Sequence, residues 1–346
     1  MVGVGLIGST LLKQILSQTP RLESGRGCVI RVVAIANHKN ILLDARGIGL
    51  KHWHKALAES KQKMDISQLI EEMKNMNLPG SVFVDCTASA EIASRYIDVL
   101  AAGISIVTPN KKANSGTLAY YQELKRTAAA YNAKFLYETN VGAGLPVIGT
   151  LNDLLQSGDH IRKIEAVLSG TLSYIFNTFI GDTKFSQAVR GAKDRGYTEP
   201  DPRDDLSGTD VARKVLILGR EIGLPLELKD IKLESLLSRR AAGAPSVEAF
   251  FEQLKKEDAV FEKKKTETER KGNRLRYVAT LEKGRVEISL KSVGSTHPFY
   301  QLSGSDNMIA FTTDRYSDTP LVVRGPGAGA EVTAAGVFAD ILRTSQ

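Results

Sequence analysis

The chain has 346 residues, 42% of them hydrophobic, and a formal net charge of +7 at pH 7. This length favours two domains, and no apolar run approaches the roughly 18 residues that a membrane span needs. The basic residues are spread along the sequence without interleaved aromatic residues, so we expect a small anionic ligand, and neither nucleic acid nor a membrane, as the partner.

The first part of the chain alternates strand-like and helical patterns. The strand-like runs are rich in β-branched residues, and helical periodicity lies between them. Such alternation predicts a doubly wound parallel sheet of the Rossmann type in the α/β class, here a dinucleotide-binding domain over residues 1–145. The strand-like runs are 2–6, 28–36, 81–86, 103–108 and 133–138, and the helical runs include 10–18, 92–102 and 118–131.

The rhythm changes after residue 145, where a second, α+β domain is expected over residues 146–315. Lys283-Gly284 separates two strand-like runs as the turn of a hairpin does. Residues 255–274 read as a solvated helix or a linker. Residues 316–346 are expected to return to the first domain. The other runs in this part are strand-like 161–169, 274–282 and 285–293, and helical 171–180, 185–196 and 210–223.

The segment GVGLIG places Gly3, Gly5 and Gly8 in the G-x-G-x-x-G spacing, directly before a helical pattern. These glycines permit a tight turn and close approach to a pyrophosphate, and the helix N-terminus offers free N–H groups. We therefore predict a dinucleotide site that includes Leu6 and Ile7. Met1 stands only two residues before Gly3, so the first strand is short. Either a longer polypeptide or a natural start with a shortened strand would account for this.

The second strand predicts which cofactor is bound, because it ends beside the adenosine ribose. NAD-specific sites commonly place an acidic residue there, whereas this chain has Asn37, His38 and Lys39. Neutral and cationic donors suit a 2′-phosphate, so NADP is expected, with NAD as the alternative.

Two lysine-bearing segments are candidates for proton transfer. Lys111 and Lys112 follow a strand at the edge where open α/β sheets bind ligands, although a loop lysine pair is often solvent-exposed. Farther on, Ser207 is expected to cap a helix whose Asp210 and Lys214 lie on one side of it. This i,i+4 pair adjoins an apolar stripe, so it is expected to line a cleft, where a lysine could exchange a proton with an alcohol oxygen.

These motifs together resemble homoserine dehydrogenase, in particular the dehydrogenase half of the bifunctional aspartate kinase–homoserine dehydrogenases. The resemblance runs nearly from end to end, and the acidic block is its most specific part. It implies a Rossmann domain joined to an α+β domain that carries the substrate and dimer contacts. The matching segments are GVGLIG, DCTAS, TPNKKANSG, ETNVGAGLP, LSGTLSYIFN, GYTEPDPRDDLSGTDVARK, HPFYQLSGSDNMIAF and RGPGAGAEVTAAGVFADIL.

The resemblance implies roles for individual residues. Lys214 would be the proton shuttle, Lys111 a positioning residue or alternative shuttle, and Lys112 the substitute if the pair is misaligned. Asp210 would contact the substrate or hold Lys214. Glu199, Gly196 and Asp205 would bind the substrate, and Thr87, Lys111 and Gly329 would bind the cofactor.

The family also binds a monovalent cation, usually sodium, in the turn that matches ETNVGAGL. The resemblance implies the carboxylate of Glu138 and the carbonyl groups of Val141, Ala143 and Leu145 as its ligands. One carboxylate followed by glycine-rich backbone suits a hard, oxygen-ligated cation, but a plain tight turn has the same pattern.

The implied activity is the reversible, NAD(P)H-dependent reduction of L-aspartate 4-semialdehyde to L-homoserine by a homodimer. Fusion to an aspartate kinase is open, and nothing supports feedback control through the regulatory domain of single-function relatives. The free cysteines Cys28 and Cys86 and the absence of a targeting segment suggest the cytoplasm, or the plastid for a plant protein. Two alternatives remain: an aldehyde-oxidising dehydrogenase with Cys86 as its nucleophile, and an NADP-sensing module without catalysis.

Overall fold

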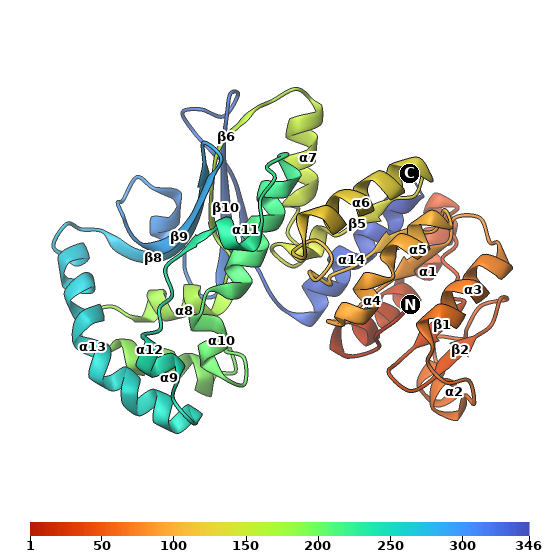
Figure 1. Cartoon of the computed structure of the whole chain (residues 1–346), viewed down its shortest axis with the longest axis horizontal. Helices are drawn as coiled ribbons and strands as arrows, with labels where there is room; N and C mark the ends of the chain where they lie inside the picture. The colour runs from red at the N-terminus through yellow and green to blue at the C-terminus, as the bar shows by residue number, and fades with distance from the viewer. Residues whose placement is uncertain (346) are drawn as a thin grey trace. The chain divides into compact units, whose positions relative to one another are not determined.

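The computed structural model describes residues 1–345, which form two compact units (Figure 1). Unit 1 comprises Met1–Gly144 together with the chain from Ala328 onward, and unit 2 comprises Leu145–Gly327. A chain that leaves its first unit and returns to it needs two crossings, which lie here at residues 144–145 and 327–328.

Unit 1 contains short strands and longer helices in alternation. Its helices are capped by the side chains expected for such positions at Asp65, Ser89 and Thr117. The elements are α1 (Leu6–Arg26), β1 (Ala34–Ala36), β2 (Ile41–Leu43), α2 (Trp53–Glu59), α3 (Ile66–Met76), β3 (Val82–Val84), α4 (Ala90–Ser94), α5 (Tyr96–Ala101), β4 (Ser105–Val107), α6 (Leu118–Ala130), β5 (Phe135–Leu136), the 3-10 helix η1 (Glu138–Asn140) and α14 (Ala330–Thr344).

The sheet of unit 1 is parallel where β3, β4 and β5 pair in that order. Val2 forms isolated parallel bridges to both Ala36 and Asp85, so the predicted strand over residues 2–6 is reduced to one bridging residue. The predicted strand 28–36 is regular only from Ala34, because the carbonyls of Val32 and Val33 accept hydrogen bonds from loop amides. An antiparallel β1–β2 pair was not predicted.

Helices cover both faces of this sheet, as a doubly wound fold requires. On one face, α1 and α14 share a core with the strand residues Val84 and Val107. On the other face, Phe83 and Phe135 pack edge-on against Tyr96 of α5, with ring centroids 6.5 and 5.8 Å apart. This packing fixes the carboxyl ends of β3 and β4, where the expected cofactor and lysine residues follow.

Unit 2 is an α+β unit whose helices pack on a mostly antiparallel sheet. Its elements are α7 (Ile148–Gln156), β6 (Ile161–Val167), α8 (Gly170–Thr178), α9 (Phe185–Asp194), α10 (Pro202–Leu206), α11 (Thr209–Glu221), the 3-10 helix η2 (Leu228–Asp230), β7 (Lys232–Leu233), α12 (Arg239–Ala242), α13 (Val247–Glu269), β8 (Arg274–Glu282), β9 (Arg285–Val293), the 3-10 helix η3 (Pro298–Gln301), β10 (Asp306–Thr313) and β11 (Leu321–Pro326).

The sheet of unit 2 has the strand order β11-β10-β6-β8-β9-β7. The predicted hairpin is confirmed: β8 and β9 are antiparallel, and Lys283 and Gly284 between them both have positive φ, 50° and 73°. The segment 255–274 was expected to be a solvated helix or a linker. Its residues 255–269 form the C-terminal part of α13. Residues 316–327 were expected to return to the first domain, but they stay with unit 2 because β11 pairs with β10.

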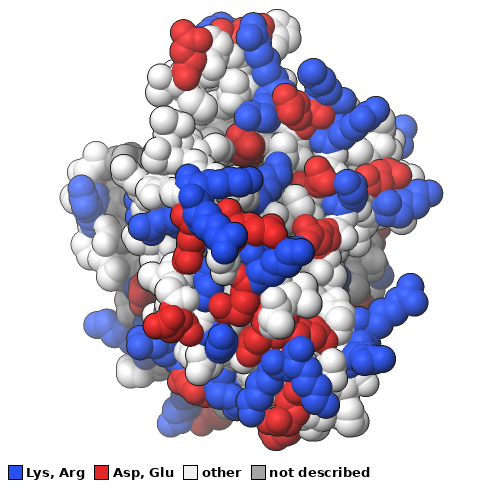
Figure 2. Space-filling view, turned by 90° about the vertical axis from the view of Figure 1, so that its left-hand side faces the viewer, with Lys and Arg blue, Asp and Glu red and all other residues white. Residues whose placement is uncertain are grey.

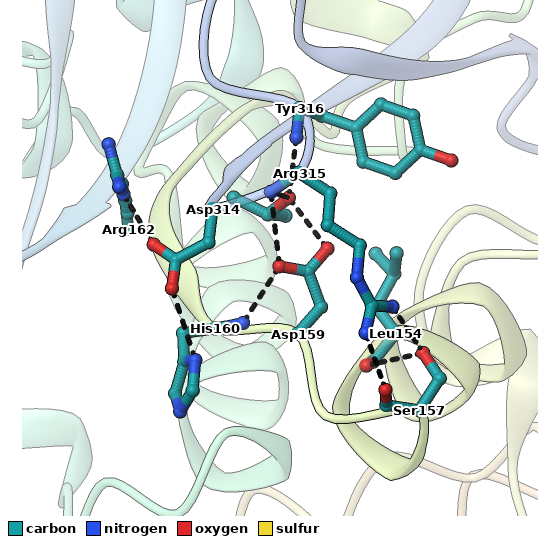
Figure 3. A network of polar contacts seen from close by, with 9 residues as sticks. Leu154, Ser157, Asp159, His160, Arg162, Asp314, Arg315 and Tyr316 are labelled. Atoms are coloured by element: carbon teal, nitrogen blue, oxygen red, sulfur yellow. Dashed lines mark hydrogen bonds and ion pairs between the residues drawn. The ribbon is translucent and has the colours of Figure 1, made fainter.

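A polar network joins the turn after β10 to the turn between α7 and β6 (Figure 3). The buried carboxylate of Asp159 accepts a hydrogen bond from the Thr313 hydroxyl at 2.8 Å. Nearby, Asp314 accepts from Nε of Arg162 at 2.6 Å, and Arg315 donates to the carbonyl of Ser157 at 2.6 Å. These contacts pin one end of the sheet to α7, which is a structural role.

The surface of the molecule carries many charged side chains. On the face drawn in Figure 2, Lys and Arg are interspersed with Asp and Glu over most of the view. A mixed pattern of this kind produces no extended field of one sign. Among residues 1–345, no helix combines the length and the apolar character that crossing a bilayer requires.

Candidate active site

The glycine-rich turn of unit 1 precedes the first turn of α1. Gly3 has a φ of +86°, and a Cβ at Gly8 would lie 2.0 Å from the carbonyl oxygen of Gly3, so both positions require glycine. A Cβ at Gly5 would meet nothing within 4 Å, and Leu6 beside it is 73% exposed. The helix end therefore leaves room for a ligand at its free N–H groups, and these residues fit a dinucleotide pyrophosphate.

The side chain of Asn37 forms a turn at the end of β1. Its Oδ1 accepts hydrogen bonds from the backbone N–H groups of Lys39 at 2.7 Å and Asn40 at 2.8 Å. His38 and Lys39 are exposed. The amide oxygen thus shapes the turn, while the imidazole and ammonium groups are accessible to an anion.

Thr87 and Lys111 follow the carboxyl ends of β3 and β4. The backbone N–H of Thr87 donates to Asp85 at 2.7 Å. The carbonyl of Lys111 accepts from both the backbone N–H and the hydroxyl of Ser115, each at 2.8 Å. Lys111 is half-buried, whereas Lys112 is exposed, which favours Lys111 as the member of the pair with a defined position.

The expected cation turn begins at a buried carboxylate. Glu138 is 5% exposed, its Oε2 lies 3.3 Å from Nη1 of Arg343, and its backbone N–H donates to Asp340 at 2.9 Å. Burial raises the pKa of Asp340 to about 6. Gly142 and Ala143 both have positive φ, 79° and 54°.

These features fit a weakly held hard cation, with Arg343 as a second positive charge on the same carboxylate. Of the remaining expected ligands, Val141 is fully buried, and the carbonyl of Leu145 accepts from the N–H of Val147 at 2.9 Å. The described residues contain no cluster of three or more His, Cys, Asp or Glu suited to a metal ion. The expected sodium ligands include a single carboxylate, so they would form no such cluster.

Gly329 lies directly before α14 in unit 1. Its φ is +122°, and its carbonyl accepts from the N–H of Thr333 at 3.0 Å. The helix it precedes packs against α1, with Nε2 of Gln14 donating to Glu331 at 3.0 Å. The expected cofactor residues Gly3 and Gly329 therefore precede two helices that pack together.

In unit 2, α11 places Lys214 in a buried position. Its Nζ donates to the carbonyl oxygen of Leu168 at 2.7 Å and forms an ion pair with Asp210 at 2.7 Å. The Lys214 side chain is 10% exposed, and that of Asp210 is 50% exposed. The ion pair between Asp210 and Lys214 that the sequence predicted is therefore present. Its ammonium is buried and its carboxylate is half-exposed.

The start of α11 differs from the sequence-based expectation. Ser207 was expected to cap this helix, but its N-cap is Gly208, with a φ of +74°. A Cβ at Gly208 would lie 2.4 Å from the Tyr277 hydroxyl, so close packing against β8 requires glycine there. Ser207 instead ends α10, and its hydroxyl oxygen accepts from the N–H of Thr209 at 3.2 Å.

The acidic loop before α10 is exposed at Gly196 and Glu199. The backbone N–H of Glu199 donates to the carboxylate of Asp205 at 2.8 Å. Burial raises the pKa of Asp205. The Thr171 hydroxyl donates to the carbonyl of Tyr197 at 2.5 Å and thereby ties the loop to the start of α8.

The expected site residues thus form separate groups within the two units. Unit 1 contains the glycine turn, Thr87, Lys111 and Gly329, and unit 2 contains Lys214, Asp210 and the acidic loop. Sequence reasoning missed Leu168, Thr171 and Asp85, which hold these groups in place. LSGT and DCT were among the family-like motifs, but only the fold shows which partners these residues contact.

Comparison with known proteins assigns both units to one family. A family model described as homoserine dehydrogenase matches residues 146–342, and a model described as homoserine dehydrogenase, NAD binding domain, matches residues 3–138. The homoserine dehydrogenase of Schizosaccharomyces pombe is 40% identical, over 99% of this chain and 94% of that protein. The chloroplastic bifunctional aspartokinase/homoserine dehydrogenase 2 of Arabidopsis thaliana is 50% identical over 99% of this chain.

The chain spans only 38% of the length of that Arabidopsis protein. Among solved structures, a Candida auris protein of unknown function has a TM-score of 0.91 and 36% identity, with 99% of this chain and 96% of that chain covered. A hyperthermophilic archaeal homoserine dehydrogenase in complex with NADPH has a TM-score of 0.75 and 25% identity, with the same coverage. The Rossmann-type fold with a second α+β domain is therefore confirmed.

Proposed function

Because this chain belongs to the homoserine dehydrogenase family, a family of NAD(P)-dependent oxidoreductases, we propose that it catalyses the reversible reduction of L-aspartate 4-semialdehyde to L-homoserine. The observation that carries this proposal within the structure is the buried ammonium of Lys214, held between the Leu168 carbonyl and Asp210. When bound, the nicotinamide supplies or accepts the hydride.

Lys214 exchanges the proton that this chemistry requires. In the reducing direction it gives a proton to the carbonyl oxygen of the semialdehyde, and in the oxidising direction it takes one from the homoserine hydroxyl. The Leu168 carbonyl and Asp210 fix its Nζ by two contacts of 2.7 Å each. Lys111 is a positioning residue or the alternative shuttle, with Lys112 as the substitute.

The acidic loop of unit 2 binds the amino-acid part of the substrate. Glu199 pairs with the ammonium group, and Asp205 holds the Glu199 backbone through its 2.8 Å hydrogen bond. Gly196, with a φ of +69°, allows the sharp turn at which the loop begins. A loop anchored at Asp205 and Thr171 while its carboxylate stays exposed can receive a cation from solution.

We assign the cofactor residues to unit 1. The pyrophosphate lies at Gly3, Gly5, Leu6, Ile7 and Gly8, and Thr87 and Gly329 border the nicotinamide. NADP is preferred over NAD, because His38 and Lys39 are exposed at the end of β1 and no carboxylate stands at position 37. Charge-assisted hydrogen bonds to the 2′-phosphate supply this preference.

A sodium ion is the proposed structural cation. Glu138 and the carbonyl groups of Val141, Ala143 and Leu145 are its ligands in this proposal. The left-handed backbone at Gly142 and Ala143 supports it, because it turns successive carbonyl groups in directions that a regular helix does not allow. Arg343 limits the affinity, since it already places a positive charge 3.3 Å from Glu138.

The proposed assembly and location follow from the family. We propose a homodimer that acts on a small-molecule substrate, and either a single-function chain or part of a fusion with an aspartate kinase. The S. pombe relative supports the first arrangement and the Arabidopsis relative the second. The cytoplasm is the proposed location, with the plastid as the plant counterpart that the chloroplastic relatives support.

Both alternative functions are less well supported. Burial and the neighbouring Asp85 raise the pKa of Cys86 to about 12, which keeps its thiol protonated at neutral pH, whereas aldehyde oxidation needs a thiolate. An NADP-sensing module would need neither the buried Lys214 nor the acidic loop. Neither alternative accounts for both groups in unit 2.

Homoserine oxidation tests the proposal directly. Purified protein is incubated with L-homoserine and either NADP⁺ or NAD⁺, and formation of reduced nicotinamide is followed by its near-ultraviolet absorbance. The proposal expects a homoserine-dependent increase that is faster with NADP⁺. L-Serine, which is one methylene shorter, is the control substrate. The proposal fails if neither cofactor is reduced although NADPH binds.

A further inference from the structure

A carboxylate with no exposed surface lies at the carboxyl end of β3. Asp85 is 0% exposed. Its Oδ1 accepts the backbone N–H of Thr87 at 2.7 Å, and its Oδ2 accepts the Tyr96 hydroxyl at 2.6 Å and Nδ2 of Asn110 at 2.9 Å. Three donors thus converge on one buried anion, which among the described residues forms no ion pair with a Lys, Arg or His side chain.

Thr108 at the end of β4 extends the contacts of Asp85. Its hydroxyl donates to the carbonyl of Asp85 at 2.8 Å and accepts from the N–H of Asn110 at 2.9 Å. Its carbonyl accepts from Nδ2 of Asn140 at 2.9 Å. Burial and the nearby Asp85 raise the pKa of Tyr96 well above its usual value, so the phenol remains a donor at neutral pH.

This network holds the two turns that carry expected functional residues. On one side it fixes the backbone of Thr87. On the other side Asn110, held by Asp85 and by the carbonyl of Ser89 at 2.9 Å, accepts the N–H of Lys112 on its Oδ1 at 3.0 Å. Lys111 lies between these two anchored residues.

We infer that Asp85 is a positioning residue that sets the relative placement of Thr87 and the Lys111 turn, and thereby the wall against which the nicotinamide binds. This inference rests on the proposed function for the identity of the cofactor and the substrate. Asp85 has no exposed surface, so it acts only through the residues that it holds.

The three donors that surround position 85 require a carboxylate there. Its two oxygens offer about four acceptor sites and no donor, which matches three converging N–H and O–H groups. An asparagine at the same place would present one acceptor oxygen and an NH₂ group that opposes a donor. A buried donor left without an acceptor costs about 1–3 kcal/mol, so the two turns would shift to find other partners.

Four variants separate positioning from general stability. Asp85→Asn removes the anion, and the double variant Asp85→Asn with Asn110→Asp exchanges amide and carboxylate across the same hydrogen bond. Tyr96→Phe removes one donor to Asp85 and the 3.0 Å contact with the Thr108 hydroxyl, but it leaves the Asp85 contacts of Thr87 and Asn110 in place. Asp159→Asn in unit 2 is the matched control, because Asp159 is also a buried carboxylate that accepts from three donors, Thr313, His160 and Arg315.

The measurements are the NADPH dissociation constant from nicotinamide fluorescence, kcat and KM for homoserine, and Tm. All binding and kinetic data are taken well below the lowest Tm. We expect Asp85→Asn to raise the NADPH dissociation constant by about tenfold and to lower kcat. The exchange variant should recover part of both losses, and Tyr96→Phe should change neither quantity much. Asp159→Asn should lower Tm and leave NADPH binding unchanged.

The inference is overturned if Asp85→Asn lowers Tm as Asp159→Asn does while NADPH binding and kcat stay at wild-type values. If Asp85→Asn does not fold, Asn110→Ser decides, because it removes the Asp85 contact of the Lys111 turn, together with the contacts of Asn110 to Ser89 and Lys112, and leaves the Thr87 contact in place; wild-type kcat in that variant overturns the inference. If the wild-type protein binds NADPH but does not oxidise homoserine, the proposed function is wrong. The NADPH dissociation constants of the variants still test the role of Asp85 in that case.

Discussion

Two carboxylates, Asp85 in unit 1 and Glu199 in unit 2, differ in their exposure to water. Asp85 in unit 1 is entirely buried, and each of its oxygens is used by a donor of the surrounding turns. Glu199 in unit 2 is exposed, and only its backbone is anchored, by Asp205. A buried anion of the first kind fixes geometry, whereas an exposed anion of the second kind is available to bind a cation.

Lys214 combines both features. Its ammonium is buried against Leu168, as a structural group would be, yet its partner Asp210 is half-exposed. A partly buried ion pair of this kind contributes little to the free energy of unfolding, because the cost of desolvating the two charges offsets much of their attraction. Stability alone therefore does not explain why the pair is present. Residues that hold the site therefore differ in exposure from residues that act in it, and substitutions of the two kinds should have different effects.

The largest effect is expected for Lys214→Ala. Removal of the proton shuttle should lower kcat by about 10²- to 10⁴-fold and leave the NADPH dissociation constant near its wild-type value. Lys265→Ala is the matched control, because Lys265 is also a buried lysine of unit 2 and donates to the carbonyls of Gly181 and Thr183. This control should lower Tm without changing kcat. Parallel loss of cofactor affinity and activity in Lys214→Ala would indicate a structural role.

A smaller effect is expected for Glu199→Gln. Loss of the charge that pairs with the substrate ammonium should raise the KM for homoserine roughly tenfold or more, since a charge-assisted hydrogen bond contributes about 1.5–3 kcal/mol. The loop itself is retained, because the contact with Asp205 uses the backbone N–H of residue 199. Asp204→Asn, on an exposed neighbour, should leave KM unchanged. An unaltered KM in Glu199→Gln would remove Glu199 from the substrate site.

Cofactor preference should change with Asn37→Asp. The new carboxylate keeps an oxygen for the N–H groups of Lys39 and Asn40, so the turn is preserved while a negative charge faces the 2′-phosphate. The ratio of kcat/KM for NADPH over NADH should fall by about tenfold or more, a shift of roughly 1.4 kcal/mol. Both cofactors are measured at the same ionic strength, because salt screens phosphate contacts. A constant ratio would show that this turn does not contact the 2′ position.

The smallest effect is expected for alkylation of Cys86. Burial, with a contribution from Asp85, raises the pKa of its thiol to about 12, so at pH 8 only about 10⁻⁴ of it is thiolate. Because the folded-state pKa is raised, the thiol stays protonated below about pH 12. Brief treatment with iodoacetamide at pH 8 should leave homoserine oxidation intact, with mass spectrometry to report labelling at Cys28 and Cys86. Rapid labelling of Cys86 with parallel loss of activity would favour thiolate chemistry.

Local patterns predicted the parts of the fold that short segments determine. The Lys283-Gly284 hairpin was predicted from a Lys-Gly pair between two strand-like runs, and the turn of GVGLIG was predicted from its glycine spacing. The structure adds that a Cβ at Gly8 would clash with the carbonyl oxygen of Gly3. The pairing of Asp210 with Lys214 followed from helical spacing alone. These features need no knowledge of distant residues.

The errors and omissions concern contacts between distant residues. Ser207 has the side chain of a helix cap, but the packing of Gly208 against Tyr277 moved the start of α11 by one residue. The strand 28–36 is regular over only three residues because the carbonyls of Val32 and Val33 accept hydrogen bonds from amides of the following loop. Asp85 and Asn110 are 25 positions apart in sequence, and their contact depends on the parallel pairing of β3 and β4.

The reaction with L-aspartate 4-semialdehyde tests the central claim most directly. With NADPH present, the account predicts that addition of the semialdehyde lowers the nicotinamide absorbance, and that the product is homoserine by mass spectrometry. With NADP⁺ in place of NADPH, the semialdehyde should produce no reduced nicotinamide. Reduction of NADP⁺ by the semialdehyde, with no consumption of NADPH in the first mixture, would show that the chain oxidises the aldehyde and would contradict the account.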